Sequence, residues 1–172
     1  MQKFILLRGH QGSGKSTYAA ELIAQFQRAH PNAQIVHIEN DKELTNEQGE
    51  YQWSSEALAA AQEKGRVRFK TALKQGQQHP ELDILIINSN TNQKAAACIQ
   101  MLQAARKHGF QTEVYRLHNF HPNTHGVDEA GVLAAYIRLN QNPLRDEIHL
   151  PAMQPMSPEQ HAKIQEMTQF KN

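Results

Sequence analysis

The sequence predicts an α/β protein with a doubly wound parallel sheet of about five strands. Short apolar runs alternate along the chain with longer stretches in which apolar residues recur at helical spacing. The run at residues 84–87, Ile-Leu-Ile-Ile, has the β-branched content of a strand that is buried on both faces. Strands that alternate with helices favour right-handed crossovers, which place helices on both faces of one sheet.

The expected strands are short, and two of them are apolar throughout. Taken in chain order, they are residues 4–7, 35–38, 84–87, 113–117 and 147–150. Ligands of a doubly wound sheet bind beyond the carboxyl ends of its strands. Residues that directly follow the strands are therefore the first candidates for a functional site.

End signals delimit the expected helices. Ser54 or Ser55 can cap a helix that ends at Gly76, and Thr91 or Asn92 can cap the next one. That next helix closes on basic residues followed by a glycine, as helix C-termini favour. In chain order, the helices are expected at residues 16–28, 54–76, 91–108 and 127–139, with a last one near the C-terminus.

Length and composition fit one domain. The 172 residues are 39% hydrophobic, and 18 basic against 17 acidic side chains give a net charge of +1, which excludes a generally basic nucleic-acid coat protein. A single cysteine, Cys98, excludes a disulfide framework and a multi-cysteine zinc module. The first apolar run is too short for a signal peptide or a membrane span, so we expect a cytoplasmic protein with no membrane partner. The oligomeric state is not predicted.

Residues 9–16 match the phosphate-binding pattern G-x-x-x-x-G-K-[ST], between an expected strand and an expected helix. The glycines let successive N–H groups turn inward, and the helix adds the positive end of its dipole. Lys15 is expected to bridge the β- and γ-phosphates of ATP, Ser16 to ligate Mg²⁺, and Thr17 to contact the α-phosphate. The residues expected to bind the nucleotide are Gly9, His10, Gln11, Gly12, Ser13, Gly14, Lys15, Ser16 and Thr17.

Further segments make the chain resemble the phage-type 5′-hydroxyl polynucleotide kinases and the related zeta-toxin kinases. The resemblance spans residues 1–139 and rests on the phosphate loop together with Asn40-Asp41, Gly49-Glu50-Tyr51, Asn90-Thr91-Asn92 and His125-Gly126-Val127. It implies a nucleoside-kinase-like P-loop NTPase domain over residues 1–150, with a lid around residues 118–126. Residues 151–172 match nothing in the family, and the Ser157-Pro158-Glu159-Gln160 start signal predicts a helix there.

By this resemblance Asp41 is the catalytic base, because a carboxylate beside the γ-phosphate can accept the proton of an attacking hydroxyl. A helix-capping aspartate is the alternative interpretation, and Glu39 is the next candidate for the base. The family usually has an aspartate after the third strand, where this chain has Asn88, Ser89 and Asn90. Ser89 and Asn90 can still hydrogen-bond metal-bound water or substrate, or else this run caps the following helix.

The expected lid contains no arginine, although lids of this family supply arginines that stabilise the transferring charge. It has instead His118, His121 and His125, and the flanking arginines are Arg116, Arg138 and Arg145. One of these side chains takes the arginine's part, or transfer is slow or lost. A zinc site built from the three histidines is a less favoured alternative to a solvated polar lid.

Basic and aromatic residues beyond the phosphate loop have two interpretations each. Arg66, Arg68 and Lys70 can line an acceptor groove, or form the solvated face of their helix, which is the more common use of such a run. Tyr51 and Trp53 can stack on a base, or pack their loop onto the core, which is the more common use of an isolated tryptophan.

The sequence therefore predicts an ATP- and Mg²⁺-dependent kinase that transfers the γ-phosphate to a hydroxyl of a nucleic acid or nucleotide. Lys15 and Asp41 are the predicted catalytic residues, and Ser16 is the predicted metal ligand. The polynucleotide 5′-OH is the first expectation for the acceptor. A hydroxymethylated base in DNA, a nucleoside and a nucleotide sugar are the alternatives. A rival from another class is an ATP-binding protein with little or no catalysis.

Overall fold

The computed structural model describes residues 1–123 and 126–169 and contains one five-stranded sheet. Its strands are β1 (Gln2–Arg8), β2 (Gln34–Ile38), β3 (Ile84–Asn88), β4 (Gln111–Arg116) and β5 (Ile148–His149). They lie in the order β2-β3-β1-β4-β5, and every neighbouring pair is parallel. This arrangement confirms the predicted α/β fold, and it places the carboxyl ends of β1, β2 and β3 along one edge.

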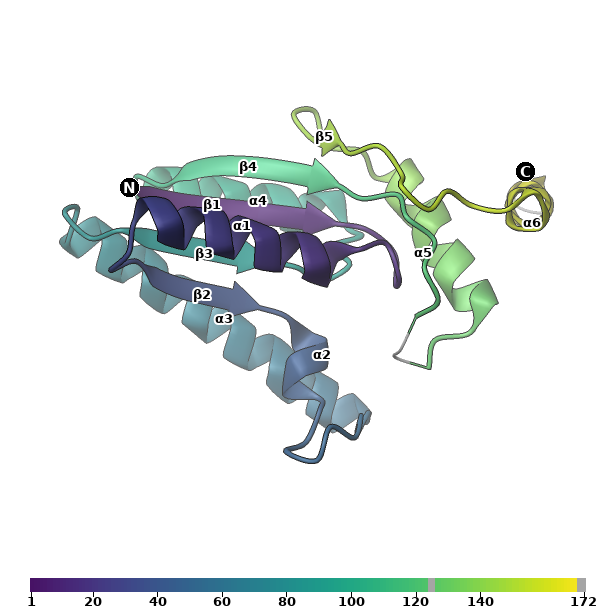
Figure 1. The fold of residues 1–172 in the computed structure, drawn as a ribbon, viewed down its shortest axis with the longest axis horizontal. Helices are drawn as coiled ribbons and strands as arrows, with labels where there is room; N and C mark the ends of the chain where they lie inside the picture. Colours follow the sequence, from purple (N-terminus) through teal and green to yellow (C-terminus); the bar gives the residue numbers. More distant parts are fainter. Residues whose placement is uncertain (124–125, 170–172) are drawn as a thin grey trace.

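Helices cover both faces of the sheet. They are α1 (Lys15–Ala29), α2 (Asn40–Glu43), α3 (Ser55–Gln78), α4 (Ala95–Lys107), α5 (Glu129–Gln141) and α6 (Pro158–Gln169). Figure 1 shows α1 on one face of the sheet, α3 and α4 on the other, and α6 beyond α5 near the C-terminus. No helix in the described part of the chain combines the length and the apolar character needed to cross a membrane.

The alternation of side chains along β1 divides the core into two layers. Phe4 and Leu6 pack with residues of α3 and α4, while Ile5 and Leu7 pack with residues of α1. All four side chains are at most 3% exposed. Cys98 lies in the α3–α4 layer as a buried apolar side chain, with no disulfide partner among the described residues. Burial on both faces explains why residues 4–7 of β1 and 84–87 of β3 are apolar throughout.

The start of α4 differs most from the sequence-based prediction, whereas the other predicted ends of α1, α3, α4 and α5 lie within two residues of those observed. The predicted caps Thr91 and Asn92 are wrong, because α4 begins only at Ala95. Asn92 instead adopts a left-handed backbone conformation with φ 51°, and its Nδ2 donates to the carbonyl of Leu7 at 2.7 Å. Helix α3 continues to Gln78 past Gly76, the predicted end.

The contacts explain why α3 continues two residues past Gly76. A Cβ on Gly76 would lie 2.6 Å from the Phe110 ring, so this glycine allows a close approach rather than ending the helix. At the other end, Ser54 caps α3 as predicted, accepting a hydrogen bond from the Ala57 N–H at 3.0 Å. Helix α6 starts with a reciprocal pair of hydrogen bonds between Ser157 and Gln160.

A buried ion pair closes the edge of the sheet next to the phosphate-binding motif. Arg8, the last residue of β1, is fully buried, and its Nη1 donates to Glu147 Oε2 at 2.7 Å. Its other nitrogens donate to three carbonyls, those of Asn92, Gln93 and Asn142. One side chain therefore joins the end of β1 to the β3–α4 loop, to the end of α5 and to the segment that leads into β5.

Replacing Glu147 by alanine is expected to lower the free energy of unfolding by about 3–5 kcal/mol, because it leaves the Arg8 guanidinium buried without a counter-charge. Glu129→Ala is the matched control, since it breaks the exposed pair with Lys163, for which the expected loss is below about 1 kcal/mol. Urea unfolding of the two variants measures both values. Equal losses would show that the buried pair has no special role.

Candidate functional site

The phosphate-binding motif forms a tight loop between β1 and α1, as the sequence predicts. Gly12 and Gly14 have φ values of 80° and 97°, which L-residues with a side chain rarely adopt. A Cβ on Gly12 would also lie 2.2 Å from the carbonyl oxygen of His121. Helix α1 begins at Lys15, so the positive end of its dipole meets the loop. The loop therefore has the backbone form of an anion-binding nest.

Lys15 holds its ammonium group against this loop. Its Nζ donates to the carbonyl of His10 at 2.9 Å and to Ser13 Oγ at 3.3 Å. Burial lowers the pKa of Lys15 to about 8, and the nearby charges of Asp41 and Glu39 oppose that shift. The structure thus brings one cation and two carboxylates together at the ends of β1 and β2.

Glu39 is the carboxylate in direct contact with the motif. It follows β2, is 8% exposed, and accepts a hydrogen bond from Ser16 Oγ through its Oε1 at 2.5 Å. Its Oε2 is also buried and lies 3.3 Å from Lys42 Nζ, but has no hydrogen-bond partner within the described residues. The sequence ranked this residue behind Asp41, although it is the first residue after the strand.

Asp41 lies in the single turn of α2 and lines the same cavity as Lys15 and Ser16. Its Oδ1 accepts a hydrogen bond from the Tyr51 hydroxyl at 3.3 Å. The cap position of α2 belongs to Glu39, so the interpretation of Asp41 as a helix cap is wrong. Asp41 lies instead within the first turn of α2 and forms part of the cavity wall.

The loop after β3 carries amides and a hydroxyl where an acidic residue was expected from the family. Asn88 Oδ1 accepts hydrogen bonds from the Asn90 N–H and from Asn92 Nδ2, and Asn90 Oδ1 accepts one from the Asn40 N–H. Ser89 Oγ lies 2.7 Å from His37 Nε2. This network fixes the β3 and β2 ends to each other. The carboxylate in contact with Ser16 is instead that of Glu39, which follows β2.

A cavity of about 770 Å³ extends from the phosphate-binding loop to the segment before α3. Tyr51 and Trp53 form part of its wall and are 37% and 60% exposed. The more common interpretation of these aromatic residues, packing onto the core, is therefore wrong for this chain. A smaller cavity of about 270 Å³ adjoins the first across Gly14 and Thr17. Helix α1, the segment after β4 and the segment after β5 line it.

The family model of an AAA domain matches residues 4–119, about two thirds of the chain and the whole phosphate-binding region. The chain belongs to this AAA domain family. A relative in Pasteurella multocida, the uncharacterized protein PM0531, is 40% identical over 157 residues, which span 91% of this chain and 87% of the relative. Kti12 of Chaetomium thermophilum, solved in complex with ADP-AlF3, shares the fold with a TM-score of 0.57 at 14% identity, over 96% of this chain and 97% of Kti12.

In this AAA domain one amide connects the phosphate-binding loop to two other segments. Asn119 Nδ2 donates to the Ser13 carbonyl at 3.0 Å, while its Oδ1 accepts from the N–H groups of Met153 and Gln154. The His121 N–H adds a hydrogen bond to the Gly12 carbonyl at 2.9 Å. The loop, the segment after β4 and the segment after β5 are thus held as one unit.

The predicted lid histidines do not form a metal site in the part of the chain that is described. His118 contacts His149 instead, with 2.8 Å between Nε2 and Nδ1. No three His, Cys, Asp or Glu side chains gather as a metal-binding group among residues 1–123 and 126–169. His125 lies outside these residues, and so does part of the predicted His125-Gly126-Val127 segment.

Two of the three arginines that flank the predicted lid, Arg116 and Arg138, make contacts within the fold. Arg116 is buried, lies 5.4 Å from the centre of the Tyr136 ring and donates to Asn140. Arg138 donates to Gln93 at 2.6 Å. Among the described residues, neither of the two cavities at the phosphate-binding loop is lined by an arginine.

Two of the three basic residues that the sequence singles out on α3, Arg66 and Arg68, make hydrogen bonds within the protein. Arg66 makes two hydrogen bonds to Glu63, at 2.8 and 2.5 Å, and Arg68 donates to the carbonyl of His37 at 3.0 Å. Both arginines lie away from the wall of the larger cavity. These contacts favour the ion-paired, solvated face over an open basic groove.

His10 of the phosphate-binding loop is a buried, neutral side chain that packs against the segment after β4. It is fully buried, stacks on Phe120 with ring centres 4.1 Å apart and meets the edge of Tyr136. Its Nε2 lies 2.6 Å from the Asn119 carbonyl, to which it donates. Burial lowers the pKa of His10 to about 3. The residue therefore stays uncharged down to acid pH.

The low pKa of His10 predicts acid sensitivity. Between about pH 6.5 and pH 3 the unfolded chain binds a proton at this position and the folded chain does not, so stability falls as the pH drops through this window. At pH 4.5 the resulting loss of stability is about 2.5 kcal/mol relative to neutral pH. Urea unfolding at the two pH values is expected to show a smaller pH effect for His10→Gln than for the wild type. Parallel profiles would contradict the assignment.

Proposed function

We propose that this AAA domain binds ATP with Mg²⁺ and transfers the γ-phosphate to a hydroxyl group. The observation that carries the proposal is the meeting of Lys15 and two carboxylates, Glu39 and Asp41, at one wall of a cavity that continues past the phosphate-binding loop. A cation for the transferring phosphate and a carboxylate for the attacking hydroxyl are the two parts that phosphoryl transfer to an alcohol requires.

On this proposal, different parts of ATP would bind at the phosphate-binding loop and in the smaller cavity. The triphosphate would lie on the inward N–H groups of residues 9–17 and against Lys15. The smaller cavity, which includes Tyr18, Pro151 and Met153 in its wall, would take the base and ribose. On this view residues 151–172 are an extension of the kinase domain of residues 1–150 that contributes to the nucleotide site.

Ser16 at the start of α1 and Glu39 after β2 fit a magnesium ion. Ser16 Oγ and Glu39 Oε1 are 2.5 Å apart, and the second oxygen of Glu39 is buried without a hydrogen-bond partner in the described structure. Hydroxyl and carboxylate oxygens are the ligands that Mg²⁺ prefers, directly or through its waters. When bound, the ion neutralises the charge that develops on the phosphate oxygens. Ser16 would be the ligand, and Glu39 would supply the charge that the loop after β3 lacks.

Asp41 would act as the catalytic base. Its carboxylate accepts the hydroxyl proton as the hydroxyl oxygen forms a bond to the γ-phosphorus, and the bond to the β–γ bridging oxygen breaks to release ADP. The hydrogen bond from Tyr51 orients the carboxylate towards the cavity. Lys15 remains with the phosphates throughout and stabilises the charge on the transferring group.

A second candidate function is ATP binding with little or no transfer. It is favoured by one observation, the lack of an arginine in the walls of the two cavities among the described residues. Arginines of this kind contribute about 10³–10⁵ to the rate of related reactions.

A transfer assay with γ-labelled ATP and Mg²⁺ separates the two candidates. The acceptors are 5′-OH DNA and RNA, DNA with hydroxymethylated bases, and nucleosides. Label on a polynucleotide 5′ end supports the acceptor that the family resemblance implies, and label on another hydroxyl supports a kinase with that acceptor. Bound ATP without label on any of them favours the binding protein.

Asp41→Asn is expected to keep ATP binding and to lower kcat for transfer by roughly 10²-fold or more, since loss of a general base typically costs that much. Lys15→Ala is expected to abolish ATP binding, because it removes the cation from the loop. Asp128→Asn is the matched control: Asp128 caps α5 at the surface, and asparagine caps a helix equally well. Full transfer activity in Asp41→Asn would move the base to another residue.

Glu39→Gln is expected to reduce the effect of Mg²⁺ on ATP affinity by roughly 10-fold or more, because residues that support a metal ligand contribute on that scale. The measurement compares the Kd of a fluorescent ATP analogue with Mg²⁺ and with EDTA. Glu43→Gln provides the control, since Glu43 pairs with Lys64 on the surface. If Mg²⁺ strengthens binding equally in both variants, Glu39 does not act on the metal side.

A further inference from the structure

We propose that the acceptor is an uncharged alcohol carrying a flat ring, a nucleoside rather than a nucleotide or a polynucleotide. The inference rests on the proposed function, because it concerns the part of the same cavity that lies beyond Asp41. Three properties of that part carry it: its aromatic wall, its negative charge and its amide groups.

The aromatic wall is formed by Tyr51 and Trp53, which precede α3. Trp53 is 60% exposed, although it is the only tryptophan of the chain and apolar packing would favour its burial. Both residues line the cavity that contains Lys15 and Asp41. Aromatic rings exposed in a cavity wall can stack on a planar ligand, and such stacking tolerates different bases.

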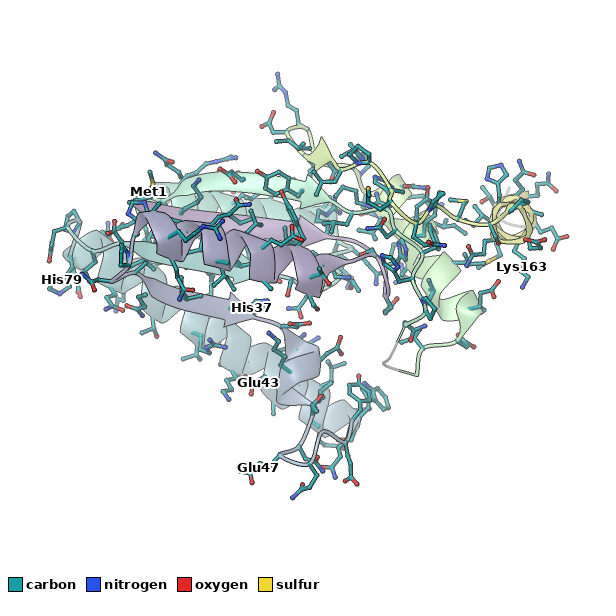
Figure 2. All side chains as sticks on the ribbon, viewed as in Figure 1. Met1, His37, Glu43, Glu47, His79 and Lys163 are labelled. Carbon is teal, nitrogen blue, oxygen red and sulfur yellow. The ribbon has the colours of Figure 1, made fainter. Side chains whose placement is uncertain are left out.

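The charge of this region disfavours an anionic acceptor. Lys15 is the only lysine or arginine in the described wall of the cavity, and the ATP phosphates would occupy it. The segment of residues 39–56 contains six acidic residues and one lysine. Figure 2 shows Glu43 and Glu47 of this segment at the α2 end of the molecule. A polynucleotide leaving the cavity here would bring its phosphates against carboxylates at close range, where salt screens them little.

Three basic side chains of α2 and α3, Lys42, Lys64 and Arg66, are already paired with carboxylates. Lys64 Nζ lies 2.6 Å from Glu43, and Lys42 Nζ lies 3.3 Å from Glu39. Arg66 lines a small neighbouring cavity of about 170 Å³, but its guanidinium is held by Glu63. A phosphate group on the acceptor would compete with a carboxylate for each of these three cations.

The remaining polar groups of the wall suit a neutral ligand. Asn40, Gln62 and Asn90 line the same cavity as Asp41 and the aromatic pair. Amide side chains both donate and accept hydrogen bonds, which matches sugar hydroxyls and base edges without contributing charge. The cavity thus offers stacking, neutral hydrogen bonds and a carboxylate for one hydroxyl.

The single tryptophan provides a direct measurement of acceptor binding. The protein is saturated with Mg²⁺ and a non-hydrolysable ATP analogue, and Trp53 fluorescence is followed during titration with uridine, thymidine or guanosine. Each nucleoside is compared with its 3′-monophosphate, which keeps the same 5′-OH and resembles the 5′ end of a polynucleotide. We expect quenching by at least one nucleoside, with a Kd roughly 10-fold or more below that of its 3′-monophosphate.

Binding of the 3′-monophosphate as tightly as the nucleoside, or more tightly, would overturn the inference. So would the lack of quenching by every nucleoside while the ATP analogue is bound. Failure to bind the ATP analogue, measured separately with a fluorescent analogue, would count against the proposed function instead.

Two variants test the stacking and the charge separately. Tyr51→Leu is expected to weaken nucleoside binding by roughly 5- to 100-fold, because it removes a stacking ring and leaves the Trp53 signal. Glu47→Lys is expected to improve binding of the 3′-monophosphate by a few fold at low salt. Its matched control is Glu81→Lys, an exposed glutamate next to His79 at the far end of the molecule (Figure 2). The same improvement in both variants, or none in Glu47→Lys, would contradict the role of the acidic segment.

Discussion

The buried guanidinium of Arg8 is the interaction on which the site depends. It stands at the end of β1, directly before the phosphate-binding loop, and reaches the β3–α4 loop, the end of α5 and Glu147. A charge without water must keep all its partners, because each lost hydrogen bond to it is costly in this environment. The segments at the carboxyl ends of the strands therefore have little freedom to move relative to one another. The phosphate-binding loop is attached to this rigid part of the fold.

Two carboxylates lie at different depths beyond the carboxyl end of β2. Glu39 follows β2 immediately and is buried against Ser16, whereas Asp41 lies one turn further and faces the cavity. The difference in position gives two acidic groups of one short segment different surroundings. A short helix after a strand is enough to separate the carboxylate that we propose for the metal from the one that we propose for the acceptor.

Much of this arrangement is readable from the sequence, and the part that is not has a physical reason. Alternating periodicities fix the order of strands and helices, and residues 9–16 fix the loop, because both depend on neighbouring residues only. The direction of Trp53, the contact of Glu39 with Ser16 and the role of Asn92 depend on segments far apart in the chain. Gly76 is likewise required by the Phe110 ring that packs against it. This distant contact is not visible in the local sequence, which predicts a helix end at Gly76.

The amide of Asn119 has a thermodynamic consequence. It bonds the phosphate-binding loop on one side and the Met153–Gln154 backbone on the other, so the order of one segment depends on the order of the other. Coupling of this kind is reciprocal. If docking of the C-terminal segment strengthens ligand binding at the loop by a certain free energy, the bound ligand strengthens that docking by the same free energy. Amide hydrogen exchange at residues 153–154 would thus report on a ligand bound at residues 9–17, and cleavage of the chain after β5 would loosen the grip on phosphate.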